Sequence, residues 1–306
     1  RGARRRRPRA SLATVAAVIA PAVVVTIYAD LRGDRALPIL DALALDAAPG
    51  DLAVCLHDPP SADDRALAGA LRDRGLRLWY AWGVDPDATR PEAEAAQRTR
   101  SRAALARDRG AELVELNGEV RWRGMPGGRA SSIIDAARTA GLPVSWSSYD
   151  HLGYHALPWA AILGPGGVDR HAPQLYGAAP GATPTGHASV RARIARAEGQ
   201  MRALVSRGLV RPELAPGGAA YDAYGQLHGM IPAGAAVVLD HTDVARAWAI
   251  PTRHDAAGLL ALRAVLRCRR AAGRSAGAVA RFQASAGLVA DGVVGQATLR
   301  ALGLAP

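Results

Sequence analysis

The sequence contains no lysine, so the 38 residues counted as Lys or Arg are all arginine, and the formal net charge is +11. An alanine-rich, arginine-only composition is typical of a GC-rich genome, which weakens the high charge as evidence about partners. A basic surface still attracts anionic polymers over a long range. Nucleic acid is not the expected partner, because the clearest arginine cluster, Arg4–Arg7, lies at the extreme N-terminus and no nucleic-acid-binding motif accompanies it.

Cysteine is scarce as well, with 2 residues, Cys55 and Cys268, far apart in the chain. The absence of a C-x-x-C pair excludes a zinc knuckle and a redox motif. We expect two buried thiols, with a single disulfide as the alternative in an exported protein. The hydrophobic share of 49% and the charged share of 21% are ordinary for a folded domain, so intrinsic disorder is not expected.

Long apolar runs are rare, and residues 1–21 alone raise the question of a membrane or export segment. The basic stretch Arg4–Arg9 precedes the apolar stretch Ser11–Ala20, which is the order found in an export signal or a short anchor. The alternative is a basic tail that leads into the first strand. No other segment has the length and apolarity that a membrane span requires.

Short apolar, β-branched runs alternate with helical patterns from Val23 onward. Eight such alternations over about 250 residues predict an α/β fold of the (β/α)8 TIM-barrel type. A doubly wound sheet is the alternative, which the lack of a G-x-G-x-x-G loop at Ala29–Gly33 disfavours. The expected strands are Val23–Ala29, Leu52–His57, Leu76–Trp82, Glu112–Leu116, Pro143–Ser148, Val168–Tyr176, Glu213–Ala219 and Ala235–Asp240.

Helical spacing and end signals fill the intervals between these strands. Three domains follow: a tail at residues 1–21, a barrel at residues 22–255, and a small all-α domain at residues 256–306. The expected helices are Asp63–Arg74, Pro91–Arg109, Ser131–Ala140, Ser189–Ser206, Asp222–Met230 and Ala256–Ala272.

The C-terminal segment carries a compact motif that includes Phe282, the one phenylalanine of the chain. Its further members are Gln283, Gly287, Leu288, Asp291, Gly292, Gly295 and Thr298. This motif resembles the small helical peptidoglycan-binding domain of many wall hydrolases. The resemblance implies that peptidoglycan is the partner and that the protein is secreted or lies in a bacterial cell envelope. Physically, Phe282 anchors a helix, Gly287 ends it, and Asp291-Gly292 forms a tight turn.

The motif departs from that family at its start. A full repeat carries an earlier Asp-Gly turn and Thr, whereas this chain has only Leu259–Arg270 there. We therefore expect a shortened domain that borrows the last helix of the barrel. The alternative is a helical cap that binds no ligand.

The fourth expected strand continues into Glu115, Asn117 and Glu119, which alternation assigns to one face. Two acids and an amide on an inward face are costly unless they have partners or a function. The run resembles the D-x-x-D-x-D-x-E signature of chitinase-like barrel glycosidases, with Glu112, Glu115 and Asn117 at its Asp positions. It also resembles the D-x-E of the barrel muramidases.

The resemblance implies hydrolysis of N-acetylated glycan strands, with Glu119 as the general acid and Asn117 orienting the acetamido group. It adds Asp30 and Glu115 to the catalytic candidates. Substrate-binding candidates are Gln174, Tyr176, Asp240 and Trp248, with Trp248 following the eighth strand. For Glu115 and Glu119, an internal salt-bridge network with Arg121 or Arg123 is the structural alternative.

Two other functions stay open. Asn117 in place of an acid favours a peptidoglycan-binding protein with an inactive barrel. A zinc-dependent wall amidase would use the pairs His57-Asp58 and Asp240-His241, although H-E-x-x-H is absent. We expect a monomer with no cofactor and no bound metal.

Overall fold

A computed structural model describes residues 23–28, 36–57, 60, 64–83, 91–118, 122–149, 156–176, 199–200, 202–209, 224–226, 245–249, 255–273, 277–292 and 294–304. Its centre is one sheet of eight strands in the order β7-β6-β5-β4-β3-β2-β1-β8. Every neighbouring pair is parallel. The strands are β1 (Val23–Tyr28), β2 (Leu52–His57), β3 (Arg77–Gly83), β4 (Leu113–Asn117), β5 (Val144–Tyr149), β6 (Arg170–Tyr176), β7 (Tyr224–Gln226) and β8 (Ala245–Ala249).

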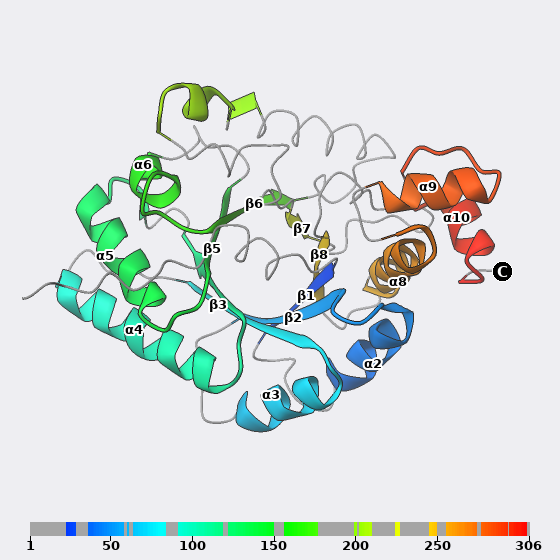
Figure 1. Cartoon of the computed structure of the whole chain (residues 1–306), viewed down its shortest axis with the longest axis horizontal. Helices are drawn as coiled ribbons and strands as arrows, with labels where there is room; N and C mark the ends of the chain where they lie inside the picture. Colours follow the sequence, from blue (N-terminus) through cyan, green and yellow to red (C-terminus); the bar gives the residue numbers. More distant parts are fainter. Residues whose placement is uncertain are drawn as a thin grey trace, which may run out of the picture.

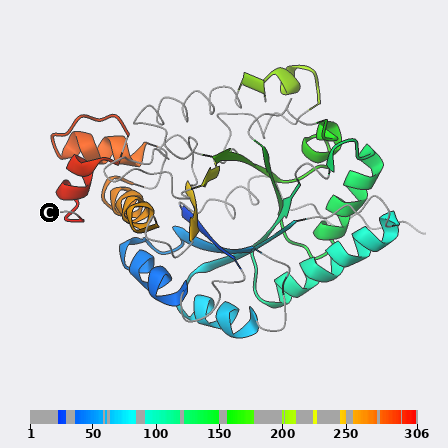
Figure 2. The same ribbon diagram turned by 180° about the vertical axis from the view of Figure 1, so that it is seen from behind.

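Helices lie on the outside of the curved sheet in both views (Figures 1 and 2). This is the expected layering, because parallel strands need crossover helices that cover the sheet. The two strands at the ends of the order, β7 and β8, lie in contact with each other. The helices are α2 (Ala36–Asp46), α3 (Asp64–Asp73), α4 (Glu92–Asp108), α5 (Gly127–Arg138), α6 (Trp159–Leu163), α8 (Asp255–Ala272), α9 (Ala278–Ser285) and α10 (Gln296–Ala301).

Alternation along the strands divides the buried apolar residues into two sets. The larger set packs between sheet and helices and includes Leu56, Trp82 and Trp146. The smaller set lies on the other face of the sheet and consists of Ala53, Cys55, Trp79, Ala81 and Leu113. We call this second face the inner face. Cys55 and Cys268 are both buried free thiols, as expected.

The first six strands lie where the sequence predicts them, with ends shifted by two residues or fewer. The seventh and eighth do not: β7 and β8 begin at Tyr224 and Ala245, whereas the expected ranges 213–219 and 235–240 lie outside the described residues. The expected helix Asp222–Met230 is wrong, because β7 occupies its centre.

The start of one predicted helix also needs correction, and two helices were missed. Helix α5 begins at Gly127 with Pro126 at its N-cap, not at a Ser131 cap, because proline pre-sets the backbone φ that a helix start requires. Helices α2 and α6 were not predicted. Within the described part of the chain, no helix is long and apolar enough to cross a membrane.

Helix α8 connects the sheet domain to the C-terminal helices. It packs against α2 on one side and against α9 and α10 on the other. Its buried residues Leu266 and Cys268 belong to the same apolar cluster as Leu43 of α2 and Val279 of α9. The C-terminal helices therefore share one continuous core with the helices that cover the sheet.

Candidate functional site

The side chain of Gln283 organises the C-terminal helices. It lies on α9 and is 3% exposed. Its Nε2 donates to Asp291 Oδ1 at 2.9 Å and to Thr298 Oγ1 at 3.0 Å, while its Oε1 accepts from the Gly292 backbone N–H at 2.9 Å. One amide therefore joins three other members of the motif, from the turn and from α10.

Two glycines of the motif allow the chain to turn, one at the end of α9 and one in the Asp291-Gly292 turn. The N–H of Gly287 (φ 70°) donates to the Ala284 carbonyl, and the N–H of Leu288 donates to the Gln283 carbonyl. These two bonds form a Schellman motif that ends α9, and the positive φ at its centre is accessible to glycine. Gly292 (φ 72°) needs the same freedom in the turn that Gln283 holds.

The apolar side of α9 and α10 faces the rest of the molecule. Val279 and Val294 are buried in the main core, and Phe282 packs against that core while partly exposed. Thr298 is buried at 2% exposure. The motif residues thus build the fold of this segment and dock it onto α8.

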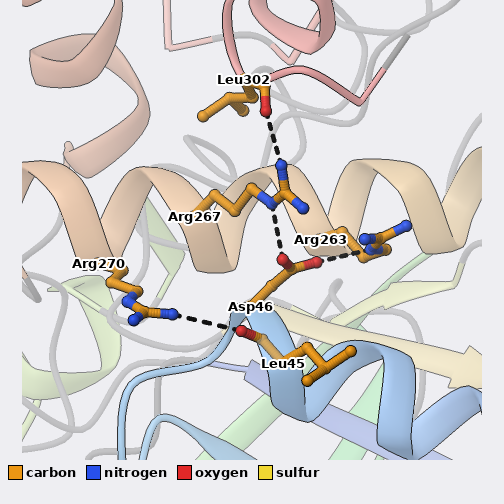
Figure 3. Close-up of polar contacts among 6 residues, drawn as sticks. All are labelled: Leu45, Asp46, Arg263, Arg267, Arg270 and Leu302. Carbon is orange, nitrogen blue, oxygen red and sulfur yellow. Dashed lines mark hydrogen bonds and ion pairs between the residues drawn. The ribbon is translucent and has the colours of Figure 1, made fainter.

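A polar cluster fixes α8 at this junction (Figure 3). The Asp46 carboxylate, at the end of α2, accepts from Arg263 Nε and from Arg267 Nε, each at 2.6 Å. Arg267 Nη1 also donates to the Leu302 carbonyl at 2.7 Å, and Arg270 Nη1 donates to the Leu45 carbonyl at 3.3 Å. Three consecutive turns of α8 are thereby tied to α2 and to the last turn of the chain.

The second candidate site lies on the inner face of the sheet. One register row runs across six strands and contains Tyr28, His57, Ala81, Glu115, Ser145 and Arg170. Its three members on β4, β5 and β6 are Glu115, Ser145 and Arg170, which are all buried. An acid, a hydroxyl and a guanidinium are therefore adjacent on neighbouring strands.

Glu115 has a hydrogen-bond partner within this row. Ser145 Oγ donates to Glu115 Oε2 at 3.3 Å, and Glu115 is 1% exposed. The guanidinium carbon of Arg170 lies 4.6 Å from the centre of the Trp79 ring, a cation–π distance. Arg123 is exposed, and Arg121 lies outside the described residues. Arg170 is thus a buried cation on the described part of this face.

Glu112 does not share this environment. It precedes β4, and its Oε2 accepts from Arg77 Nε at 2.5 Å in a partly exposed ion pair. Arg77 is the first residue of β3, so the pair lies at the amino ends of the strands. Chemistry in parallel α/β barrels is found at the opposite, carboxyl ends.

At the carboxyl end of β4 the environment opens. Asn117 is half-buried and pairs in register with Ser147 of β5, whereas Glu115, two residues earlier, is closed in. A Cβ on Gly118 would lie 1.9 Å from a ring carbon of Trp146. Glu119, the expected general acid, follows directly and lies outside the described residues.

The remaining expected residues are placed only by their strands. Gln174 and Tyr176 are on β6, which pairs them with Tyr224 and Gln226 of β7. Trp248 lies within β8 and pairs with Thr26, so it does not follow the eighth strand as expected. The physical cause of this error is that the alternating Ala245–Ala249 segment is itself the strand. Asp30 and Asp240 lie outside the described residues.

For the zinc alternative, the backbone of His57 ends β2, and Asp58 and His241 lie outside the described residues. Among the residues that the structure describes, no group of three or more His, Cys, Asp and Glu is arranged to hold a metal ion.

Sequence reasoning missed two buried residues of β6. Arg170 joins the inner row, and His171 lies on the opposite face, where its ring is 6.1 Å from that of Trp159. Burial lowers the pKa of His171 to about 3. The sequence contains a signal for Arg170. It lies four residues before Gln174, so strand alternation assigns both residues to one face.

Comparison with known families identifies one segment. The family described as "Putative peptidoglycan binding domain" matches residues 273–302. No curated protein matches the chain.

Three similar solved structures have low TM-scores. A pyruvate carboxylase from Rhizobium etli is 20% identical over 45% of this chain and 14% of its own length, with a TM-score of 0.34. Two structures of a "putative deoxyribose-phosphate aldolase" from Toxoplasma gondii ME49 are 15% and 16% identical. They cover 70% and 69% of this chain and 93% and 90% of their own, with TM-scores of 0.38 and 0.39. These values are too low to assign a fold from them.

Proposed function

We propose that the chain binds peptidoglycan through its C-terminal helices and acts at a bacterial cell envelope. The observation that carries this proposal is the Gln283 network. The four residues Gln283, Asp291, Gly292 and Thr298 belong to the peptidoglycan-binding motif, and they contact one another in a single hydrogen-bonded unit. The family match over residues 273–302 supports the same function.

The proposed binding domain spans residues 256–306 and includes α8. Only α9 and α10 fall within the matched segment, and two short helices bury too little apolar surface to fold alone. Packing of α8 against both of them supplies the missing helix. In this view α8 belongs to the wall-binding domain and to the sheet domain at once.

A second proposed function is hydrolysis of N-acetylated glycan strands by the sheet domain, with its eight strands closing a (β/α)8 barrel at β7 and β8. The specific observation in its favour is the gradient along β4, from buried Glu115 to half-buried Asn117 at the carboxyl end. Glu119 comes two residues later. We propose Glu119 as the general acid and Asn117 as the residue that orients the acetamido group.

In this proposal Glu115 does not touch substrate. A side chain that is 1% exposed and accepts a hydrogen bond from Ser145 is a positioning residue. The substrate would contact groups nearer the strand ends, for which Gln174, Tyr176 and Trp248 stay as candidates with Asp30 and Asp240.

Both functions are tested with purified peptidoglycan sacculi. We expect the wild-type chain to co-sediment with sacculi and to release reducing ends, and Glu119→Gln to bind equally well but release none. Glu112→Gln is the matched control, because its carboxylate pairs with Arg77 at the other end of the strands. Binding without release by any variant leaves a non-catalytic wall-binding protein. Failure of the wild type to co-sediment refutes the proposed binding function.

A further inference from the structure

The polar members of the C-terminal motif have little capacity left for a ligand. Gln283 uses its amide within the domain, Thr298 is 2% exposed, and the Gly292 N–H is already bonded. Asp291 is exposed, yet its carboxylate accepts from Gln283. These residues define the fold of the segment, and the contact with the wall must come from other side chains.

The side of α9 and α10 that packs on the core is not available to a ligand either. Val279 and Val294 are buried against the core, and Leu299 and Leu302 pack on it. What is left is the outer side: the loop after α9 and the exposed positions of α10. Val289 of that loop is 81% exposed, one of two large hydrophobic residues that the described part of the chain exposes to this degree, with Leu45 at 75%.

The C-terminal helices also expose a positive charge, at Arg300 of α10. Arg300 is exposed in the last turn of α10, and its side chain makes no hydrogen bond or ion pair with the described residues. Arg281 differs, because its Nε and Nη2 donate to the Ala272 and Gly273 carbonyls at the end of α8. Of these two arginines, Arg300 is therefore the one available to an external anion.

We propose that Val289 and Arg300 each contact peptidoglycan, and that they recognise the stem peptide rather than the sugar chain. The argument is charge complementarity. Stem peptides carry carboxylates and methyl groups, which match a guanidinium and an exposed aliphatic side chain, whereas the N-acetylated sugars themselves are neutral. This inference rests on the proposed wall-binding function and names the part of the wall that is bound.

The test measures the affinity of the full chain for purified sacculi by co-sedimentation. Val289→Ser and Arg300→Gln should each weaken binding about fivefold to tenfold, the size expected for one lost apolar contact or one charge-assisted hydrogen bond. Arg300→Lys should retain most of the affinity because it keeps the charge. Unfolding midpoints should not change, since both side chains are exposed.

Two matched variants serve as controls. Leu45→Ser removes the other exposed aliphatic side chain, on α2, and Arg72→Gln removes an exposed arginine from the last turn of α3. Both should bind sacculi as the wild type does. If the controls lose affinity and the outer variants keep it, the contact surface is elsewhere and the inference is wrong.

A second arm separates peptide from sugar. Soluble stem peptides should compete with sacculi for the wild-type chain, whereas neutral N-acetylglucosamine oligomers should not, and competition by the sugar oligomers alone would overturn the assignment to the stem peptide. Wild-type chain that binds no sacculi at all refutes the wall-binding function itself, and this inference with it. Normal wild-type binding with unchanged Val289→Ser and Arg300→Gln refutes only the surface.

Discussion

Arg267 Nε donates to the Asp46 carboxylate at 2.6 Å, although the two residues are 221 positions apart in the chain. Asp46 is 4% exposed and also accepts from Arg263, so one buried carboxylate holds two turns of α8. The same Arg267 reaches the Leu302 carbonyl. A single arginine thus connects α2, the shared helix α8 and the end of the C-terminal segment.

Asp46→Ala should therefore destabilise the whole molecule. It leaves two partly buried guanidiniums without their carboxylate, which costs about 1–3 kcal/mol once their partial exposure is considered. The measurement is urea unfolding followed by tryptophan fluorescence. Asp41→Ala is the control on the same helix, since Asp41 is 52% exposed in its pair with Arg74 and should change stability little. Equal losses in the two variants would contradict a special role for Asp46.

Gln283→Met should unfold the wall-binding segment while leaving the sheet intact. Methionine keeps the length and loses the three hydrogen bonds of the Gln283 amide to Asp291, Gly292 and Thr298, at a cost of about 2–4 kcal/mol. Binding to sacculi should be lost, and amide hydrogen exchange in α9 and α10 should rise. Gln97→Met, on the exposed side of α4, should alter neither. Retained wall binding in Gln283→Met would refute the network as the basis of the fold.

Most of the first six strands were predictable because they are runs of apolar, aromatic or β-branched residues with turn signals beside them. The last two were not. Tyr224–Gln226 has three residues with a glycine at its centre, and Ala245–Ala249 has no β-branched residue. Their strand conformation depends on neighbours in the sheet, which local sequence does not report. Helix α2 escaped notice because its sequence ALPILDALALD is apolar on nearly all sides.

The candidate sites divide in the same way. The C-terminal motif could be identified from sequence, because its members are close together and their spacing is fixed by short-range turns. The burial of Glu115 beside Ser145 could not be identified from sequence. Their contact depends on the register between β4 and β5, and the two residues are 30 positions apart. The sequence did show which residue types alternate along β4. It could not show where along that strand burial ends, which is at Asn117.

Gly118→Ala should be strongly destabilising, although it adds only one methyl group. The new Cβ would lie 1.9 Å from a carbon of the Trp146 ring, which is fully buried and packs edge-to-face on Trp122 at 4.5 Å. Because neither ring can move freely, we expect a loss of about 3 kcal/mol from overpacking.

Gly69→Ala is the matched control, and we expect it to stabilise the protein where Gly118→Ala destabilises it. Gly69 lies inside α3, and a Cβ there meets no atom within 4 Å. The substitution should stabilise the protein by about 0.5–1 kcal/mol through helix propensity. Thermal unfolding of both variants checks the pair, and a neutral Gly118→Ala would mean that Trp146 has room to move.

His171 should make the protein sensitive to mild acid. Its ring is fully buried beside Trp159, and neither ring nitrogen has a hydrogen-bond partner among the described residues. Burial lowers its pKa from 6.5 to about 3, so below pH 6.5 the unfolded chain binds a proton that the folded chain does not. Stability is full above pH 6.5 and falls as the pH decreases toward 3, by roughly 2 kcal/mol between pH 8 and pH 5.

His171→Leu isolates this contribution, because it fills the same buried position and cannot take up a proton. The free energy of unfolding, measured in urea from pH 8 to pH 5, should fall with a clearly smaller slope in His171→Leu than in the wild type. The variant should gain most relative to the wild type at pH 5, where the wild-type imidazole opposes folding most. Identical slopes would show that other groups carry the acid sensitivity and that His171 is protonated equally in both states.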